Sequence, residues 1–122
     1  MRLQKIVQVS IAVITGLYAS AALADEASIN AFVERTLVSG DATYGGCMAL
    51  LSEDPAEVLP ACRARWVTFS CDGTHTDPVR AYRMLDQAQL ALATGMAVYV
   101  TVDDSKTHDG YCFASRIDLR SQ

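Results

Sequence analysis

The fold is decided by the stretch DPVRAYRMLDQAQLALATGMAVYVTVD, residues 77–103. Its first part predicts a helix over Pro78–Thr94, because Asp77 is a good N-cap, proline suits the first helical position and Gly95 suits the C-cap. After Gly95 the apolar period changes from 3.6 to 2 residues, which predicts a strand over Met96–Asp103. Apolar side chains recur at helical spacing within the helix: Ala81, Leu85, Ala88 and Leu92.

Four more segments have the composition of strands. One is predicted over Cys62–Cys71 before the helix and one over Gly110–Leu119 after it. Upstream, Ala31–Ser39 and Thr43–Leu51 predict two further strands, joined by a turn at Gly40-Asp41. Five strands with a helix between the third and the fourth are typical of a Greek-key barrel of OB-fold type. An open α+β sheet with one packed helix fits the same order of elements.

The N-terminal residues have the pattern of a secretory signal peptide. A short positively charged segment precedes a mostly apolar run over Ile6–Leu17, and Ala22–Ala24 supplies the small residues that a signal peptidase accepts. The apolar run is shorter than the about 20 residues of a membrane-spanning helix, although a membrane anchor is the alternative. We therefore expect residues 1–24 to be a signal peptide and residues 25–122 to form a single OB-fold-like domain, which is exported to the periplasm or secreted.

The charge balance limits the partners of this domain. The chain has 10 Lys and Arg against 14 Asp and Glu, a net charge of −4 at pH 7. Arg2 and Lys5 leave with the predicted signal peptide, so the remaining domain is more acidic still. Binding of nucleic acid or of an anionic membrane needs clustered Lys and Arg. We therefore expect no nucleic-acid partner and no membrane association after cleavage.

The four cysteines predict two disulfides, because an even number in a small exported domain is usually paired and no C-x-x-C motif favours a metal site. Cys62 and Cys71 are an odd number of positions apart on one predicted strand, so they face opposite sides and belong to different bridges. Two connectivities remain: Cys47–Cys71 with Cys62–Cys112, or Cys47–Cys62 with Cys71–Cys112. Strands three and five of the predicted barrel run parallel, which brings their beginnings together and favours Cys62–Cys112.

Residues 84–100 resemble the B subunits of subtilase-type and typhoid-type AB5 toxins. The matching residues are Met84-Leu85-Asp86-Gln87-Ala88 and Ala93-Thr94-Gly95-Met96-Ala97-Val98-Tyr99-Val100. They are similar to a pattern L-x-x-Q-A … T-G-x-x-V-x-[IV] that leads from the toxin helix into a strand. The toxin subunits also have one cysteine on strand two and one on strand three, which implies a Cys47–Cys71 pair here. The resemblance implies an OB-fold that assembles into a ring of five and recognises cell-surface glycans.

This chain departs from the toxin pattern at two places. The toxin subunits have a cysteine pair near the C-terminus, where this chain has only Cys112. Their sialic-acid-binding serine falls near Asn30, which is not a serine.

Most candidate ligand-binding residues lie on or beside two predicted polar loops, 39–44 and 103–110. Asn30 is added because of the toxin resemblance, and Tyr99 as an aromatic side chain suited to stacking on a sugar. The candidates are Asn30, Asp41, Tyr44, Tyr99, Asp103, Asp104, His108 and Tyr111. The second loop lacks the D-x-D-x-D-G spacing of a calcium loop, and the chain has no G-x-S-x-G nucleophile motif. We therefore expect no metal, no cofactor and no catalytic residue.

Two further groups of side chains point to partners. Trp66, flanked by Arg63 and Arg65, has the composition of a stacking or partner contact, although ordinary barrel packing also explains it. Arg80 and Arg83 lie near the positive end of the predicted helix dipole, an unfavourable place for cations, so a carboxylate partner is expected for them.

Two classes of function fit these features. The first is an exported, non-catalytic binding module that recognises a cell-surface glycan or a protein, and that is a pentamer if it is toxin-like. The alternative is a monomeric periplasmic protein that has a structural or inhibitory role and binds a protein partner.

Overall fold

The computed structural model describes residues 10–13, 15–16 and 25–121. Most of the predicted signal peptide, including its cleavage site at Ala22–Ala24, lies outside these residues, so that interpretation stays a prediction. No helix in the described ranges is long and apolar enough to cross a membrane.

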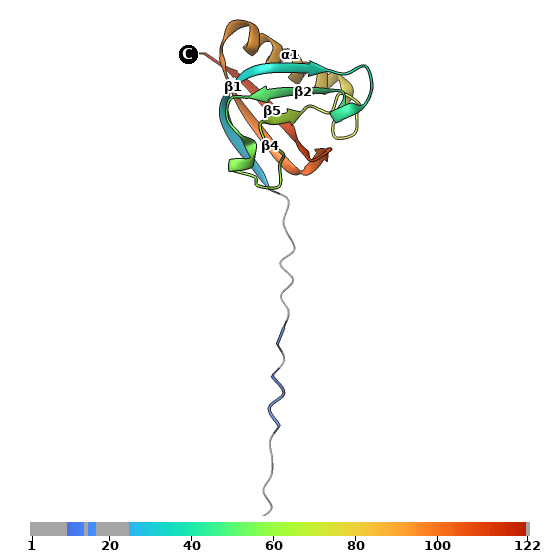
Figure 1. The fold of residues 1–122 in the computed structure, drawn as a ribbon, viewed down its shortest axis with the longest axis vertical. Helices are drawn as coiled ribbons and strands as arrows, with labels where there is room; N and C mark the ends of the chain where they lie inside the picture. The colour runs from blue at the N-terminus through green and yellow to red at the C-terminus, as the bar shows by residue number, and fades with distance from the viewer. Residues whose placement is uncertain (1–9, 14, 17–24, 122) are drawn as a thin grey trace, which may run out of the picture.

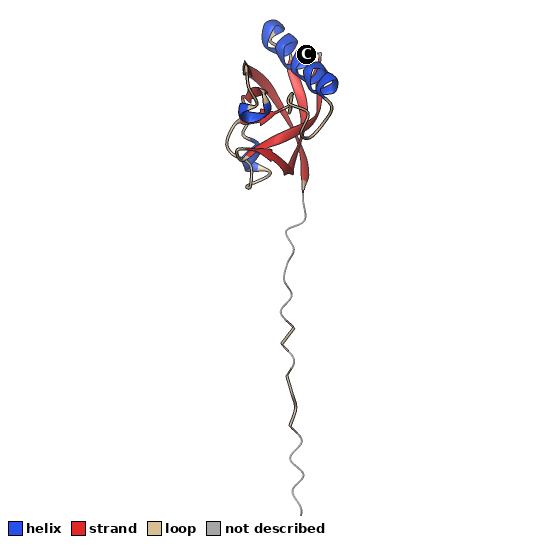
Figure 2. Ribbon diagram, turned by 90° about the vertical axis from the view of Figure 1, so that its right-hand side faces the viewer, coloured by secondary structure: helices blue, strands red, loops and turns tan. Residues whose placement is uncertain are grey.

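The described domain is a closed five-stranded barrel with one α-helix, as predicted (Figure 1). The strands follow the order β1-β2-β3-β5-β4 around the barrel, and β1 closes it by pairing with β4. This closure contradicts the open-sheet alternative. Figure 2 shows the helix lying across one end of the barrel. The elements are β1 (Glu26–Val38), the 3-10 helix η1 (Thr43–Gly45), β2 (Cys47–Leu51), the 3-10 helix η2 (Pro55–Glu57), β3 (Trp66–Thr68), α1 (Pro78–Thr94), β4 (Ala97–His108) and β5 (Tyr111–Arg120).

The helix has the predicted bounds and the predicted caps. The Asp77 carboxylate accepts hydrogen bonds from the backbone N–H groups of Val79 and Arg80, and Gly95 ends the helix with φ 71°. The buried stripe of the helix differs from the predicted one at its last position. Ala91 is buried there, whereas Leu92, which was predicted to be buried, is 41 % exposed. The buried stripe closes the end of the barrel with small side chains around Leu85.

The core fills the inside of the barrel with alternate residues of the strands. Val98, Val100 and Val102 of β4 are fully buried and face inward together, as their period of 2 predicts. Phe69, just after β3, is the largest fully buried side chain. The aliphatic residues of β1 and β2 complete this core.

The bounds of three predicted strands are wrong, because long-range pairing decides where a strand begins and ends. β1 begins at Glu26 and not at Ala31, since its first half pairs with β4. The predicted second strand loses its start, Thr43–Gly46, to η1 and to a glycine in the left-handed region. The predicted third strand, Cys62–Cys71, is a strand only over Trp66–Thr68.

The prediction of a polar loop over residues 103–110 is also wrong. β4 continues to His108, with extra residues accommodated where its register against β5 shifts between Asp103 and Thr107. Only Asp109-Gly110 turns the chain, and both residues adopt positive φ angles, 52° and 83°. The acidic segment is therefore half of a hairpin and not an open recognition loop.

Both disulfides have the favoured connectivity, Cys47–Cys71 and Cys62–Cys112. β3 and β5 are parallel neighbours, with Thr68 opposite Phe113, which brings Cys112 beside the segment that precedes β3. Cys62 and Cys71 both lie outside β3, so the prediction that they lie on one strand and face opposite sides is wrong. Two disulfides are compatible with export to an oxidising compartment.

Candidate functional site

Two of the predicted ligand-binding residues meet in one pocket on the outside of the barrel. The rings of Tyr44 and Tyr111 pack edge to face, with centroids 5.4 Å apart and planes at 89°. A hollow of about 200 Å³ lies beside them. We call it the aromatic pocket; its lining residues are Leu37, Tyr44, Met48, Trp66 and Tyr111.

Four strands and one turn converge on the aromatic pocket. Leu37 comes from β1, Met48 from β2, Trp66 from β3 and Tyr111 from β5, while Tyr44 belongs to η1. The neighbours of Met48 along β2 face the barrel core, so Met48 faces outward. It is nevertheless only 2 % exposed, and it lines the same pocket as the three aromatic rings. The pocket therefore has an apolar floor and aromatic walls.

Two arginines bring positive charge to this aromatic surface. The guanidinium carbon of Arg63 lies 4.4 Å from the ring centroid of Tyr111, and that of Arg35 lies 5.9 Å from Trp66. Arg63 also donates a hydrogen bond of 3.1 Å to the carbonyl of Asp109. Arg65 is placed differently, since it pairs with Glu34 and donates to the carbonyl of Leu51 at 3.3 Å, so its role in a partner contact stays a prediction.

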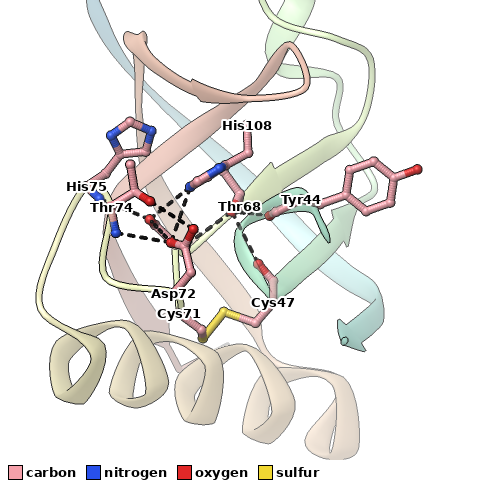
Figure 3. The surroundings of a disulfide bond; sticks show 9 residues. Tyr44, Cys47, Thr68, Cys71, Asp72, Thr74, His75 and His108 are labelled. Carbon is pink, nitrogen blue, oxygen red and sulfur yellow. Dashed lines mark hydrogen bonds and ion pairs between the residues drawn. A yellow bond between two sulfur atoms is a disulfide. The ribbon is translucent and has the colours of Figure 1, made fainter. Parts of the chain in front are cut away.

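Tyr44 is held in an unusual backbone conformation. Its φ angle is 54°, and Thr68 Oγ1 donates a hydrogen bond of 2.7 Å to its carbonyl (Figure 3). Gly45 follows with φ 79°, and a Cβ added there would lie 2.6 Å from the ring of His108. Figure 3 shows the Tyr44 ring extending away from these contacts, while the Cys47–Cys71 disulfide lies next to them. The turn therefore presents a fixed aromatic ring to the pocket.

Asp41 organises the same turn from its other side. Its carboxylate accepts hydrogen bonds from the Ser39 hydroxyl at 2.6 Å and from the Thr43 backbone N–H at 2.9 Å. The Ser39 N–H also bonds to the carbonyl of Gly46 at 2.8 Å, which closes the loop. The bond from Ser39, followed by those from Thr43, lowers the pKa of Asp41 to about 2. Asp41 thus shapes the turn and does not line the aromatic pocket.

We expect the Asp41 carboxyl group to titrate near pH 2 in the folded protein. Because its folded pKa lies below its unfolded value, the ionised group stabilises the turn fully above about pH 4, and this contribution is lost as the pH falls through about 2. An NMR titration of the Asp41 carboxyl carbon and the Thr43 amide measures this. Asp41→Asn is the control, because it removes the transition at Thr43. A carboxyl that titrates near 4 contradicts the prediction.

His108 belongs to a separate polar cluster around the loop that follows β3. Its Nε2 lies 3.0 Å from Ser70 Oγ and 3.5 Å from Asp72 Oδ1, and its ring centroid lies 4.8 Å from that of His75 (Figure 3). Burial opposes ionisation of Asp72, but hydrogen bonds from Thr74 and Ser70 and the nearby His108 outweigh it, so the pKa of Asp72 is lowered.

This cluster contains Ser, His and Asp but lacks the geometry of a catalytic triad. Ser70 donates its only hydroxyl hydrogen to Asp72 at 2.9 Å, so it meets His108 as an acceptor. Serine and carboxylate both approach the same nitrogen, whereas in a triad the acid orients the other ring nitrogen. Ser70 is also fully buried. The contacts join the loop after β3 to β4.

The remaining predicted residues lie elsewhere and take part in strand contacts. Asn30 and Tyr99 face each other across β1 and β4, and the Asn30 side chain accepts a hydrogen bond from Arg120. Asp103 is 8 % exposed and accepts bonds of 2.8 and 2.6 Å from Ser105. Asp104 accepts a bond of 2.8 Å from the N–H of Asp25. Within the described residues no three His, Cys, Asp or Glu side chains gather in an arrangement that could hold a metal ion.

Comparisons of the chain with models of protein families, with curated proteins and with solved structures found no match. The resemblance of residues 84–100 to toxin B subunits therefore stays a prediction from those residues.

Sequence reasoning missed Leu37, Met48 and Arg35 as neighbours of the site. The alternation along Cys47–Leu51 could have placed Met48 on the outer face of its strand. No local pattern could have shown that Leu37 and Arg35 lie beside Tyr44 and Trp66, because the contacts depend on how β1 to β3 pair.

Proposed function

We propose that the protein is an exported, non-catalytic binding module that recognises a glycan in the aromatic pocket. The observation that carries the proposal is the convergence of Tyr44, Trp66 and Tyr111 on one outward face. This face combines β2 and β3 with the turn after β1 and the hairpin before β5, the region that OB-folds use to bind oligosaccharides and oligonucleotides. The acidic net charge favours the sugar over the nucleic acid.

The chemistry of the pocket suits a sugar. Aromatic faces pack against the apolar C–H side of a sugar ring, while the guanidinium groups of Arg63 and Arg35 donate hydrogen bonds to its hydroxyl oxygens. A second hollow of about 200 Å³ continues past Tyr44 and shares Leu37 with the first. The two hollows form one elongated surface, which fits an oligosaccharide better than a single small molecule.

The resemblance to toxin B subunits supports a glycan as the ligand. It does not support a glycan contact at the position of the sialic-acid-binding serine of those subunits. Asn30, near which the sialic-acid-binding serine of those subunits falls, pairs across to β4 and does not line the aromatic pocket. We therefore place the sugar on the tyrosines and Trp66. A ring of five subunits is the toxin-like version of this proposal, and its alternative is a monomer with a structural or inhibitory role.

The test uses a glycan array and the fluorescence of Trp66, the only tryptophan of the chain. We expect an array hit to shift Trp66 emission, and Tyr111→Ala to weaken that binding about tenfold, since an aromatic contact contributes roughly 0.5–1.5 kcal/mol beyond its buried area. Tyr82→Ala is the matched control, because Tyr82 is 48 % exposed on α1.

Three results would count against the proposal: no hit on the array, a hit that leaves Trp66 emission unchanged, or equal losses in both tyrosine variants. Far-UV circular dichroism confirms that the variants remain folded. Native mass spectrometry of the exported protein then separates the pentamer from the monomer.

A further inference from the structure

A longer groove lies between α1 and β5 and shares no residue with the aromatic pocket. It consists of two adjoining hollows of about 450 and 370 Å³, which have Arg83, Met84 and Ile117 in common. We call it the α1–β5 groove. Its floor is apolar, because Met84 is half-buried, Ile117 is 8 % exposed and Phe113 is 4 % exposed. The groove therefore offers a site for apolar side chains on an otherwise acidic protein.

The rim of the α1–β5 groove concentrates positive charge at one end. Arg80, Arg83 and Arg116 line it there, three of the ten Lys and Arg of the chain. No acidic residue lines this end, whereas Asp86 lines the other. A ligand with carboxylates at this end is therefore favoured.

The three arginines differ in the carboxylates they already have. Arg116 forms a two-pronged pair with Asp118, at 2.7 and 2.8 Å. Arg80 is 3.4 Å from Asp77, whose other oxygen caps the helix, and its side chain is 81 % exposed. The Arg83 side chain has no hydrogen bond or ion pair within the described residues, although its backbone belongs to α1. The sequence predicted a carboxylate partner for Arg80 and Arg83, and the chain itself supplies only a long contact to one of them.

The third observation is an unpaired strand edge along the α1–β5 groove. β5 pairs with β4 over its whole length, but it pairs with β3 only where Phe113 lies opposite Thr68. In the part of the chain that the structure describes, residues 115–120 thus have no strand on the side away from β4. Ser115, Arg116 and Ile117 of this segment also line the groove. An unpaired edge offers backbone N–H and C=O groups to another chain.

We propose that the α1–β5 groove binds an extended, acidic segment of a partner protein, which adds a strand to β5. The strand edge selects a polypeptide, since a sugar cannot continue a sheet. Alternate side chains of an extended peptide face the same way. Apolar side chains at every second position pack on Met84 and Ile117, and a Glu or Asp side chain at the end of the segment beside Arg80 and Arg83 meets these arginines. This surface acts independently of the aromatic pocket.

The probe is a fluorescein-labelled peptide of alternating Glu and Val, measured by fluorescence anisotropy with the exported protein. We expect it to bind at low salt and to weaken at 1 M salt, where screening shortens to about 3 Å. We expect a Lys–Val peptide not to bind. The double variant Arg80→Glu/Arg83→Glu should weaken binding at least tenfold. Acidic residues near a helix N-terminus are favourable, so the variant should stay folded.

Arg35→Glu is the control, since it reverses the charge of one arginine beside the aromatic pocket instead of in the α1–β5 groove, and we expect no loss of peptide binding. Backbone amide signals of residues 115–120 should shift on addition of the peptide. The proposal is overturned if the Arg80/Arg83 variant binds normally, or if a peptide with a fully N-methylated backbone binds equally well. It is also overturned if the protein dimerises through the α1–β5 groove, because a second copy is then the occupant.

Discussion

Reduction of both disulfides will leave the protein largely unfolded at 37 °C. The two bridges close loops with sequence separations of 24 and 50 residues. In the chain-entropy description these loops stabilise the fold by roughly 3.5 and 4 kcal/mol. Their sum is comparable with the whole free energy of unfolding of a small domain, about 5–15 kcal/mol.

Urea denaturation followed by far-UV circular dichroism, with and without reductant, measures this effect. The paired variants Cys47→Ala/Cys71→Ala and Cys62→Ala/Cys112→Ala separate the two bridges. We expect the second variant to lose slightly more stability, because its bridge closes the longer loop. An unchanged midpoint after complete reduction contradicts the prediction.

Loss of the Cys47–Cys71 bridge also bears on the proposed glycan site. Cys47 follows the turn that presents Tyr44, and the Thr68 hydroxyl shares its one hydrogen between the carbonyls of Tyr44 at 2.7 Å and Cys47 at 3.3 Å. A variant without this bridge should therefore bind the array ligand more weakly than a variant without Cys62–Cys112, when both are compared under conditions in which they are folded.

The second large effect is expected for Phe69→Ala, which should lower the free energy of unfolding by about 3–5 kcal/mol. Phe69 is fully buried inside the barrel, and no other fully buried side chain is larger. Its removal leaves a cavity that strands tied by two disulfides cannot easily collapse to fill.

The matched control for Phe69→Ala is Phe32→Ala, because the Phe32 side chain is 49 % exposed. Its cost should stay within about 1 kcal/mol. Urea melts of both variants, with disulfides intact, decide between the two sites. Equal losses would mean that Phe69 does not hold the centre of the core.

Local signals account for the parts of the fold that were predicted correctly. The bounds of α1 depend on Asp77, Pro78 and Gly95, whose effects act within one helical turn. The inward face of β4 follows from its alternating valines. The wrong boundaries of β1 and β3 arise from pairing with strands that are distant in the sequence, which no local pattern contains.

Some of the predicted ligand-binding residues lie together in the structure, and others do not. Tyr44 and Tyr111 were predicted because they lie on or beside the expected loops 39–44 and 103–110, and the structure brings the two rings together. His108, also predicted, faces a polar cluster instead, since β4 continues through the segment that was expected to be a loop.

By itself the sequence determined the helix, its two caps, the inward valines and the even number of cysteines. These features depend on neighbours within a few residues or on composition alone. Only the tertiary structure decided which side chains line the aromatic pocket and the α1–β5 groove. Leu37, Met48, Trp66 and Tyr111 come from four different strands. Among the described residues, 115–120 of β5 lack a second strand partner because β3 is short. Register between strands is set by the whole closed barrel, so the surfaces that it creates exist only once the chain has folded.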